Sequence, residues 1–129
     1  MTQPRILLFD IETAPIDGYT WGTYDTNVIH IIQDWYMLSF SCKWLGEEEV
    51  YTYSLPQYKT QYRKNKKDDY ELVKQLWKYF DEADVIIAHN NDGFDAPKST
   101  ARFIYHGLLP PTPYKTICTL KMAKNAVLR

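Results

Sequence analysis

Apolar residues occur in short runs along this chain, and the composition of these runs predicts strands. Residues 5–12 form an apolar run between two prolines, which favours a buried central strand over a helix. Residues 35–45 and 49–54 are rich in aromatic and β-branched side chains and are separated by a glycine and a run of glutamates, which is typical of a β-hairpin. Two further short strands are expected at residues 84–89 and 114–117.

Helical spacing appears in the second half of the chain. A set of apolar residues recurs at helical spacing and predicts a helix that ends near residue 82: Val73, Leu76, Trp77 and Phe80. Asp68 or Asp69 can cap the start of this helix. Further helices are expected at residues 97–106, before Gly107, and at residues 119–128.

Two segments lack a regular pattern and are expected to be loops. Residues 16–33 mix glycine, aspartate and asparagine with aromatic and β-branched residues, which predicts a loop that holds at most one short turn or strand. Residues 56–67 are polar and basic without a period, which predicts a surface loop. The remaining elements, strands first and then alternating helices and strands, predict an α/β layered domain with the first strand at its centre.

Composition limits the class of protein. The chain has 129 residues, 45% of them hydrophobic, and a net charge of -1, which predicts one globular domain over residues 1–129. The near-neutral charge excludes a global positive field, so nucleic-acid binding would depend on a local site. Two cysteines are too few for a disulfide scaffold, and no apolar run approaches the ~20 residues of a membrane span. We therefore expect a cytoplasmic protein (host cytoplasm if viral) that does not bind membranes.

The first strand ends in two carboxylates. Asp10 and Glu12 are two positions apart, so in a strand they project from the same face, beyond the apolar Ile6 and Leu8. Carboxylates this close repel each other unless a cation neutralises them, and Mg²⁺ and Mn²⁺ prefer such oxygen ligands. An isolated pair of this kind is more often a strand end that meets solvent.

A second polar segment follows the strand expected at residues 84–89. If that strand runs parallel to the first, Asp95 lies at the same edge of the sheet and completes a three-carboxylate cluster with Asp10 and Glu12. The alternative role for Asp95 is the N-cap of the following helix, and the two roles are compatible. Asp92 is expected to make hydrogen bonds within the turn.

Together, these segments resemble the DEDD-type 3'–5' exonucleases, the DnaQ-like branch of the ribonuclease-H-like fold, which includes polymerase proofreading domains. The family's first motif, aspartate–x–glutamate on the first strand, matches residues 9–13 (FDIET). Its second motif matches His89 and Asn90 followed by Phe94 and Asp95. The segments after this motif, PKSTARFIYHGL and TICTLKMAK, also resemble the family's helices.

The resemblance implies a mixed sheet flanked by helices and hydrolysis of DNA from the 3' end with two Mg²⁺ or Mn²⁺ ions. By motif matching, Asp10 would bridge both ions, Glu12 would hold the ion on the nucleophile side, and Asp95 would hold the other. The resemblance also implies that Asn90 and Phe94 support the site or position the substrate. The other candidate substrate-binding residues are Thr13 and, as phosphate contacts on the helix after Asp95, Lys98 and Arg102. Packing beneath the site is favoured for Phe94 over stacking on a base, and a structural role is favoured for His89.

The family's third motif, a fourth carboxylate with a tyrosine or histidine on a later helix, has no match, since no Asp or Glu follows Asp95. We expect an incomplete domain that lacks its C-terminal helices and works with a polymerase, with the missing segment or as a homodimer. The expected substrate is single-stranded DNA or a DNA 3' end, in replication or proofreading.

Two further groups are candidates for substrate contacts. The basic stretch Lys59–Lys67 carries Tyr58 and Tyr62 between its cations, as in an arm that contacts phosphates. A solvated loop whose tyrosines pack back on the domain is the favoured alternative. Trp21 and Tyr24, after the first motif, are the other candidates.

Three functions fit these observations: a 3'–5' exonuclease, a binding module for nucleic acid or polymerase that lacks catalysis, and another ribonuclease-H-like nuclease. Asp10, Glu12 and Asp95 together favour the first, and the missing fourth carboxylate favours the second. The pairing of the two motifs argues against the third.

Overall fold

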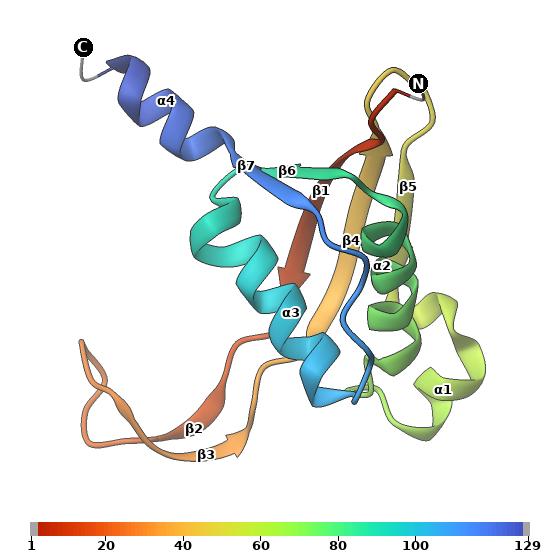
Figure 1. Cartoon of the computed structure of the whole chain (residues 1–129). Helices are drawn as coiled ribbons and strands as arrows, with labels where there is room; N and C mark the ends of the chain where they lie inside the picture. Colours follow the sequence, from red (N-terminus) through yellow and green to blue (C-terminus); the bar gives the residue numbers. More distant parts are fainter. Residues whose placement is uncertain (1–2, 128–129) are drawn as a thin grey trace.

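A five-stranded mixed sheet runs through the molecule in the order β5-β4-β1-β6-β7 (Figure 1). The structure, a computed structural model, describes residues 3–127. The strands of this sheet are β1 (Ile6–Thr13), β4 (Met37–Trp44), β5 (Tyr51–Ser54), β6 (Val85–Ala88) and β7 (Lys115–Cys118). The strand β1 lies at the centre, as the sequence predicts. It pairs with β4 antiparallel and with β6 parallel.

The two longest helices that pack on the sheet cover the same face. They are α2 (Tyr70–Glu82) and α3 (Ala96–Tyr105), which lie side by side (Figure 1). Phe80 of α2 joins the layers, with its ring centroid 5.0 Å from that of Phe9 on β1 and 5.3 Å from that of Phe103 on α3. Such edge-to-face pairs add to the free energy gained by burying apolar area. The predicted helices are confirmed in type and order.

The alternation along β1 divides its residues between two environments. Leu7, Phe9 and Ile11 are buried beneath the helices, whereas Asp10 and Glu12 are exposed on the opposite face. This is the period of two that a half-covered strand requires. The burial pattern therefore selects the face on which the carboxylates stand.

Residues 16–33 differ from the loop expected there. They form an antiparallel hairpin of β2 (Asp17–Thr20) and β3 (Val28–Gln33), which projects from the end of β1 (Figure 1). Side chains on both faces of this hairpin are exposed, so no alternation of buried and exposed residues marks it in the sequence. Backbone pairing, which the pattern of side chains does not reveal, defines these strands.

The expectation of a loop at residues 56–67 is also wrong in part. The short 3-10 helix η1 (Leu55–Gln57) and the helix α1 (Lys59–Lys64) occupy most of this segment. Tyr58 and Tyr62 lie four residues apart and both pack against the core, which anchors the helix. The alternative in which these tyrosines pack back on the domain is confirmed.

The chain continues from β7 into α4 (Thr119–Val127), which extends away from the sheet (Figure 1). Residue 128 of the predicted last helix lies outside the described residues. Among residues 3–127, no helix is both long and apolar enough to cross a membrane.

An aromatic cluster fastens α2 to the outer strands of the sheet. The hydroxyl groups of Tyr79 on α2 and Tyr53 on β5 are 2.7 Å apart, and the Tyr79 ring also packs near Phe40 and Trp44. Burial raises the pKa of Tyr79, and the hydrogen bond with Tyr53 raises it further.

We expect Tyr79→Phe to lower the free energy of unfolding by about 1 kcal/mol, because it removes one part-buried hydrogen bond and keeps the ring. Urea unfolding followed by circular dichroism measures this change. Tyr24→Phe is the control, since Tyr24 is 87% exposed. Equal stability of the two variants would contradict the assigned role of the Tyr79 hydroxyl.

Candidate functional site

The carboxylates of β1 stand at the end of the strand. Asp10 and Glu12 pair across the sheet with Ser41 and Ser39 of β4, and on the same face Leu8 pairs with Lys43. Within residues 3–127, none of the ion pairs involves either carboxylate. These two groups therefore present negative charge that no basic side chain of the described chain neutralises.

Asp95 reaches the same strand from the other side. It ends the π-helical turn η2 (Asn91–Asp95), which follows β6, and its Oδ1 accepts a hydrogen bond from the backbone N–H of Ile11 at 3.3 Å. Ile11 lies between Asp10 and Glu12 in the sequence. The predicted meeting of the two motifs at one edge of the sheet is thus present, with Asp95 attached to the backbone of the first motif.

The buried position of Asp95 shifts the pKa of its carboxyl group. Its side chain is only 2% exposed. Burial raises the pKa of Asp95 to about 6; the hydrogen bond from Ile11 opposes the rise, and the negative charges of Asp10 and Glu12 add to it. Like charges shift a pKa in this way only when they lie close, so the three carboxyl groups interact electrostatically.

The turn η2 aims Asp95 at the strand. Asn90 has a φ of 61°, in the left-handed region, and its carbonyl oxygen accepts a hydrogen bond from the N–H of Phe94. A Cβ on Gly93 would lie 2.6 Å from Oδ1 of Asn90, so a larger residue there would require the exposed side chain of Asn90 to move. Because the chain is already helical at Asp95, its carboxylate makes no cap hydrogen bond, and the predicted N-cap role is wrong.

The three carboxyl groups interact without forming a closed ligand set. Within residues 3–127, no group of three or more His, Cys, Asp or Glu side chains is arranged to hold a metal ion. Asp95 directs one oxygen at the strand backbone, while Asp10 and Glu12 are exposed. Carboxylates repel one another when no cation lies between them, and the exposed side chains of Asp10 and Glu12 can turn towards solvent. This repulsion explains why the three groups do not gather into one ligand set.

The predicted substrate-binding residues lie in different surroundings. Thr13 is half-buried at the end of β1, Asn90 is exposed, and Phe94 packs against the core, as favoured for it. Lys98 lies one helical turn beyond Asp95, and its ammonium group is 4.3 Å from the ring centroid of Trp35. These positions leave Asn90 and Lys98 accessible near the carboxylates.

Arg102 is not a free phosphate ligand, contrary to prediction. It is buried, and it donates to both oxygens of Asp69, at 2.9 Å from Nε and 2.6 Å from Nη2. Asp69 is fully buried and also accepts the N–H of Met37 at 2.8 Å, while His106 Nε2 lies 2.6 Å from its Oδ1. The carboxylate of Asp69 thus joins β4 to α3.

Of the two aspartates that could cap α2, only Asp68 makes a hydrogen bond to the start of the helix. Asp69 occupies the N-cap position but makes no cap hydrogen bond with its side chain. Asp68 accepts the N–H of Tyr70 at 3.0 Å instead. The sequence contains no signal that distinguishes these neighbours, since the partners of Asp69 come from distant segments.

Sequence reasoning also missed Asn91. This residue is fully buried, and its amide nitrogen donates to the carbonyl oxygens of Ile86 and Ile117, which join β6 to β7. His89 bonds to Thr119 at 2.9 Å, as expected of a structural residue. Asp92, expected to bond within the turn, pairs with Lys121 at 2.8 Å.

Comparison with known proteins supports the assignment of the fold. No family model and no curated protein matches the chain. A family B DNA polymerase from the hyperthermophilic archaeon Pyrobaculum calidifontis is similar in structure, with a TM-score of 0.65 and 15% sequence identity. The match covers 95% of this chain and 16% of the polymerase chain. At this identity the likeness concerns the fold, which is an α/β, ribonuclease-H-like fold with a mixed sheet flanked by helices.

Proposed function

We propose that this chain is a 3'–5' exonuclease domain that hydrolyses DNA and works in replication or proofreading. The observation that carries the proposal is the attachment of Asp95 to Ile11, between Asp10 and Glu12. A buried carboxyl group beside two exposed ones costs free energy, so a purely structural role explains it poorly. Similarity of fold to part of a DNA polymerase supports the same class of activity.

The chemistry of the donor set suits Mg²⁺ or Mn²⁺, and the side chains would have to reorient to hold two such ions. All three groups offer carboxylate oxygens, and no basic side chain pairs with them in the described part of the chain. When bound, the ions would activate a water and stabilise the leaving 3' oxygen. Asp10 and Glu12 would hold them from the exposed face and Asp95 from the buried side. Asn90 and Lys98 would position the substrate.

Asp10→Asn is expected to slow digestion of DNA by about 10²–10³-fold, the usual cost of losing one preorganised catalytic group. The assay follows a 5'-labelled single-stranded oligonucleotide in Mn²⁺, with an RNA of the same sequence in parallel. Products that shorten from the 3' end are expected. Asp17→Asn is the matched control, because Asp17 is an exposed acid on β2. Equal loss in both variants, or no digestion by the parent chain, would argue against the proposal.

A nucleic-acid-binding module without nuclease activity is the second candidate. It is favoured by the lack, within residues 3–127, of three side chains arranged to hold a metal ion. Binding of the oligonucleotide with unchanged affinity in Asp10→Asn, together with no digestion by either protein, is the result that this alternative predicts.

A further inference from the structure

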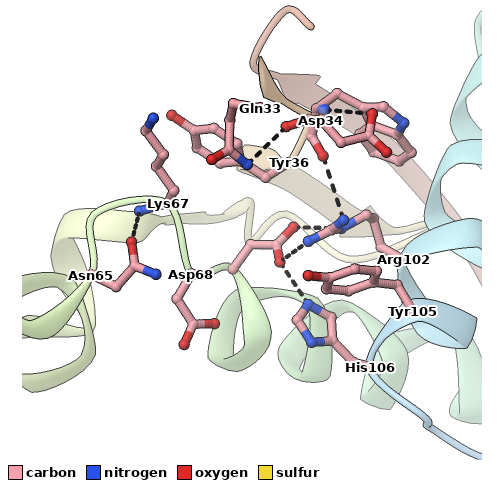
Figure 2. A pocket seen from close by; sticks show the side chains of 11 residues that line it. Gln33, Asp34, Tyr36, Asn65, Lys67, Asp68, Arg102, Tyr105 and His106 are labelled. Atoms are coloured by element: carbon pink, nitrogen blue, oxygen red, sulfur yellow. Dashed lines mark hydrogen bonds and ion pairs between the residues drawn. The ribbon is translucent and has the colours of Figure 1, made fainter. Parts of the chain in front are cut away.

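A polar cavity of about 450 Å³ lies at the C-terminal end of α3 (Figure 2). The end of α3 forms one wall and the loop before α2 forms the opposite wall, while the connection from β3 to β4 closes a third side. Its volume falls in the ~300–1,000 Å³ range of small-ligand pockets. None of the roles assigned above uses this cavity.

The α3 wall is rigid. Asp69 holds Arg102 through two hydrogen bonds, and the guanidinium carbon of Arg102 lies 4.1 Å from the ring centroid of Tyr105. The same carbon is 5.4 Å from the ring centroid of Trp35. These contacts fix the stacked groups before any ligand arrives, so binding would cost little ordering of side chains.

The opposite wall offers groups that can form new hydrogen bonds. Asn65 uses its Oδ1 to accept the N–H of Lys67 at 3.0 Å. Within the described part of the chain, no hydrogen bond or ion pair engages the amide nitrogen of Asn65, the ammonium group of Lys67 or the hydroxyl of Tyr105. Figure 2 shows Asn65 and Lys67 on one side of the cavity and Tyr105 on the other.

The charges around the cavity favour a base over a phosphate group. Asp34 and Asp68 also line it, and their carboxylates would repel a phosphate held inside. An amide, a hydroxyl and the exposed ring of Tyr105 are groups that can bind the edge and the face of a nucleobase. Lys67, on the wall that the loop before α2 forms, is then placed to contact a phosphate that flanks such a base.

The cavity also lies at a defined distance from the carboxylates. Asp95 directly precedes α3, and Arg102 lies seven residues further along the chain, in the last turn of that helix. At ~1.5 Å per residue they are about 10 Å apart along the helix axis. That span corresponds to about three stacked nucleotides at ~3.4 Å each.

We propose that this cavity binds a base of the single-stranded substrate about three nucleotides from its 3' end. This inference rests on the proposed function, because the carboxylates define where the 3' end lies. A strand would then run from the carboxylates along the exposed side of α3, past Lys98 and Trp35, with one base held at Tyr105.

Photocrosslinking tests the proposal without requiring catalysis. Oligodeoxynucleotides that carry one 5-iododeoxyuridine at the first, fourth or seventh position from the 3' end are irradiated with the chain in EDTA. Mass spectrometry then locates the crosslinked residue. We expect the fourth position, three steps from the terminal nucleotide, to give the strongest crosslinks, to Tyr105, Tyr36 or Trp35. Crosslinks at Trp21 or Tyr24 instead, equal yields from all positions, or no crosslinks would overturn the proposal.

Oligonucleotide binding by a Tyr105 variant and competition by a free nucleotide test the proposal further. Tyr105→Ala should weaken oligonucleotide binding by about 5- to 150-fold, the effect of losing one stacked base. Tyr105 is 71% exposed, so the variant should fold, and Ile104→Ala, at a residue 72% exposed on the same helix, is the control. If thymidine monophosphate abolishes the crosslink as effectively as the oligonucleotide, the cavity binds free nucleotides and the proposal is wrong.

The outcomes separate this inference from the proposed function. Digestion that depends on Asp10, without crosslinks in the cavity, would overturn only the inference. Crosslinks at Tyr105 without digestion would overturn the exonuclease and retain the cavity as the base site of a binding module.

Discussion

Asp69→Ala is expected to lower the free energy of unfolding by about 3–5 kcal/mol, the usual cost of removing one partner from a buried ion pair. The variant leaves the buried guanidinium of Arg102 without its carboxylate, and it also removes the acceptor for the N–H of Met37. Since small domains are stable by only about 5–15 kcal/mol, much of the population could unfold.

Urea unfolding followed by circular dichroism measures this loss, with the neighbouring Asp68→Ala as the control. Asp68 accepts the N–H of Tyr70, so its removal should cost about 1 kcal/mol, as for other residues that cap helices. Replacing both partners, as in Asp69→Leu with Arg102→Met, should cost less than Asp69→Ala alone. Equal effects of Asp69→Ala and Asp68→Ala would refute the role assigned to Asp69.

Asp95→Asn is expected to stabilise the fold at pH 8 in EDTA by about 1–3 kcal/mol, at ~1.4 kcal/mol per unit of pKa shift. Folding raises the pKa of Asp95 from 3.8 to about 6. A raised pKa means that the folded state binds the proton more tightly, so stability falls as pH rises from about 4 to about 6 and stays lower above that. Asparagine remains neutral and can still accept the N–H of Ile11.

The pH dependence distinguishes this explanation from a general packing effect. Unfolding curves in EDTA should show the advantage of Asp95→Asn at pH 8 and a much smaller one at pH 4, where the parent carboxyl group is protonated. Under the proposed function, Mn²⁺ should stabilise the parent chain more than the variant, because it binds the folded state. A variant less stable than the parent at pH 8 would contradict the prediction.

Most of the fold follows from local pattern. The apolar run that becomes β1, the aromatic strands β4 and β5, and the helical spacing of Leu76 and Phe80 each determine an element through burial of one face. The hairpin at residues 17–33 escaped prediction because its side chains are exposed on both faces. The helix α1 escaped because only two tyrosines anchor it among basic residues.

The candidate site likewise has features that the sequence predicts and features that only the tertiary structure decides. The sequence by itself determined that Asp10 and Glu12 share one face of β1, since a strand has a period of two, and that Asp95 follows a later strand; the parallel pairing of β6 with β1, which brings Asp95 to the same edge, comes from the tertiary structure. Only the tertiary structure decided that Asp95 bonds to Ile11 instead of capping a helix, and that Arg102 serves Asp69 instead of a phosphate. The physical reason is that hydrogen-bond partners of buried polar groups come from distant segments, and a polar group that loses water takes whichever partner the packing brings near.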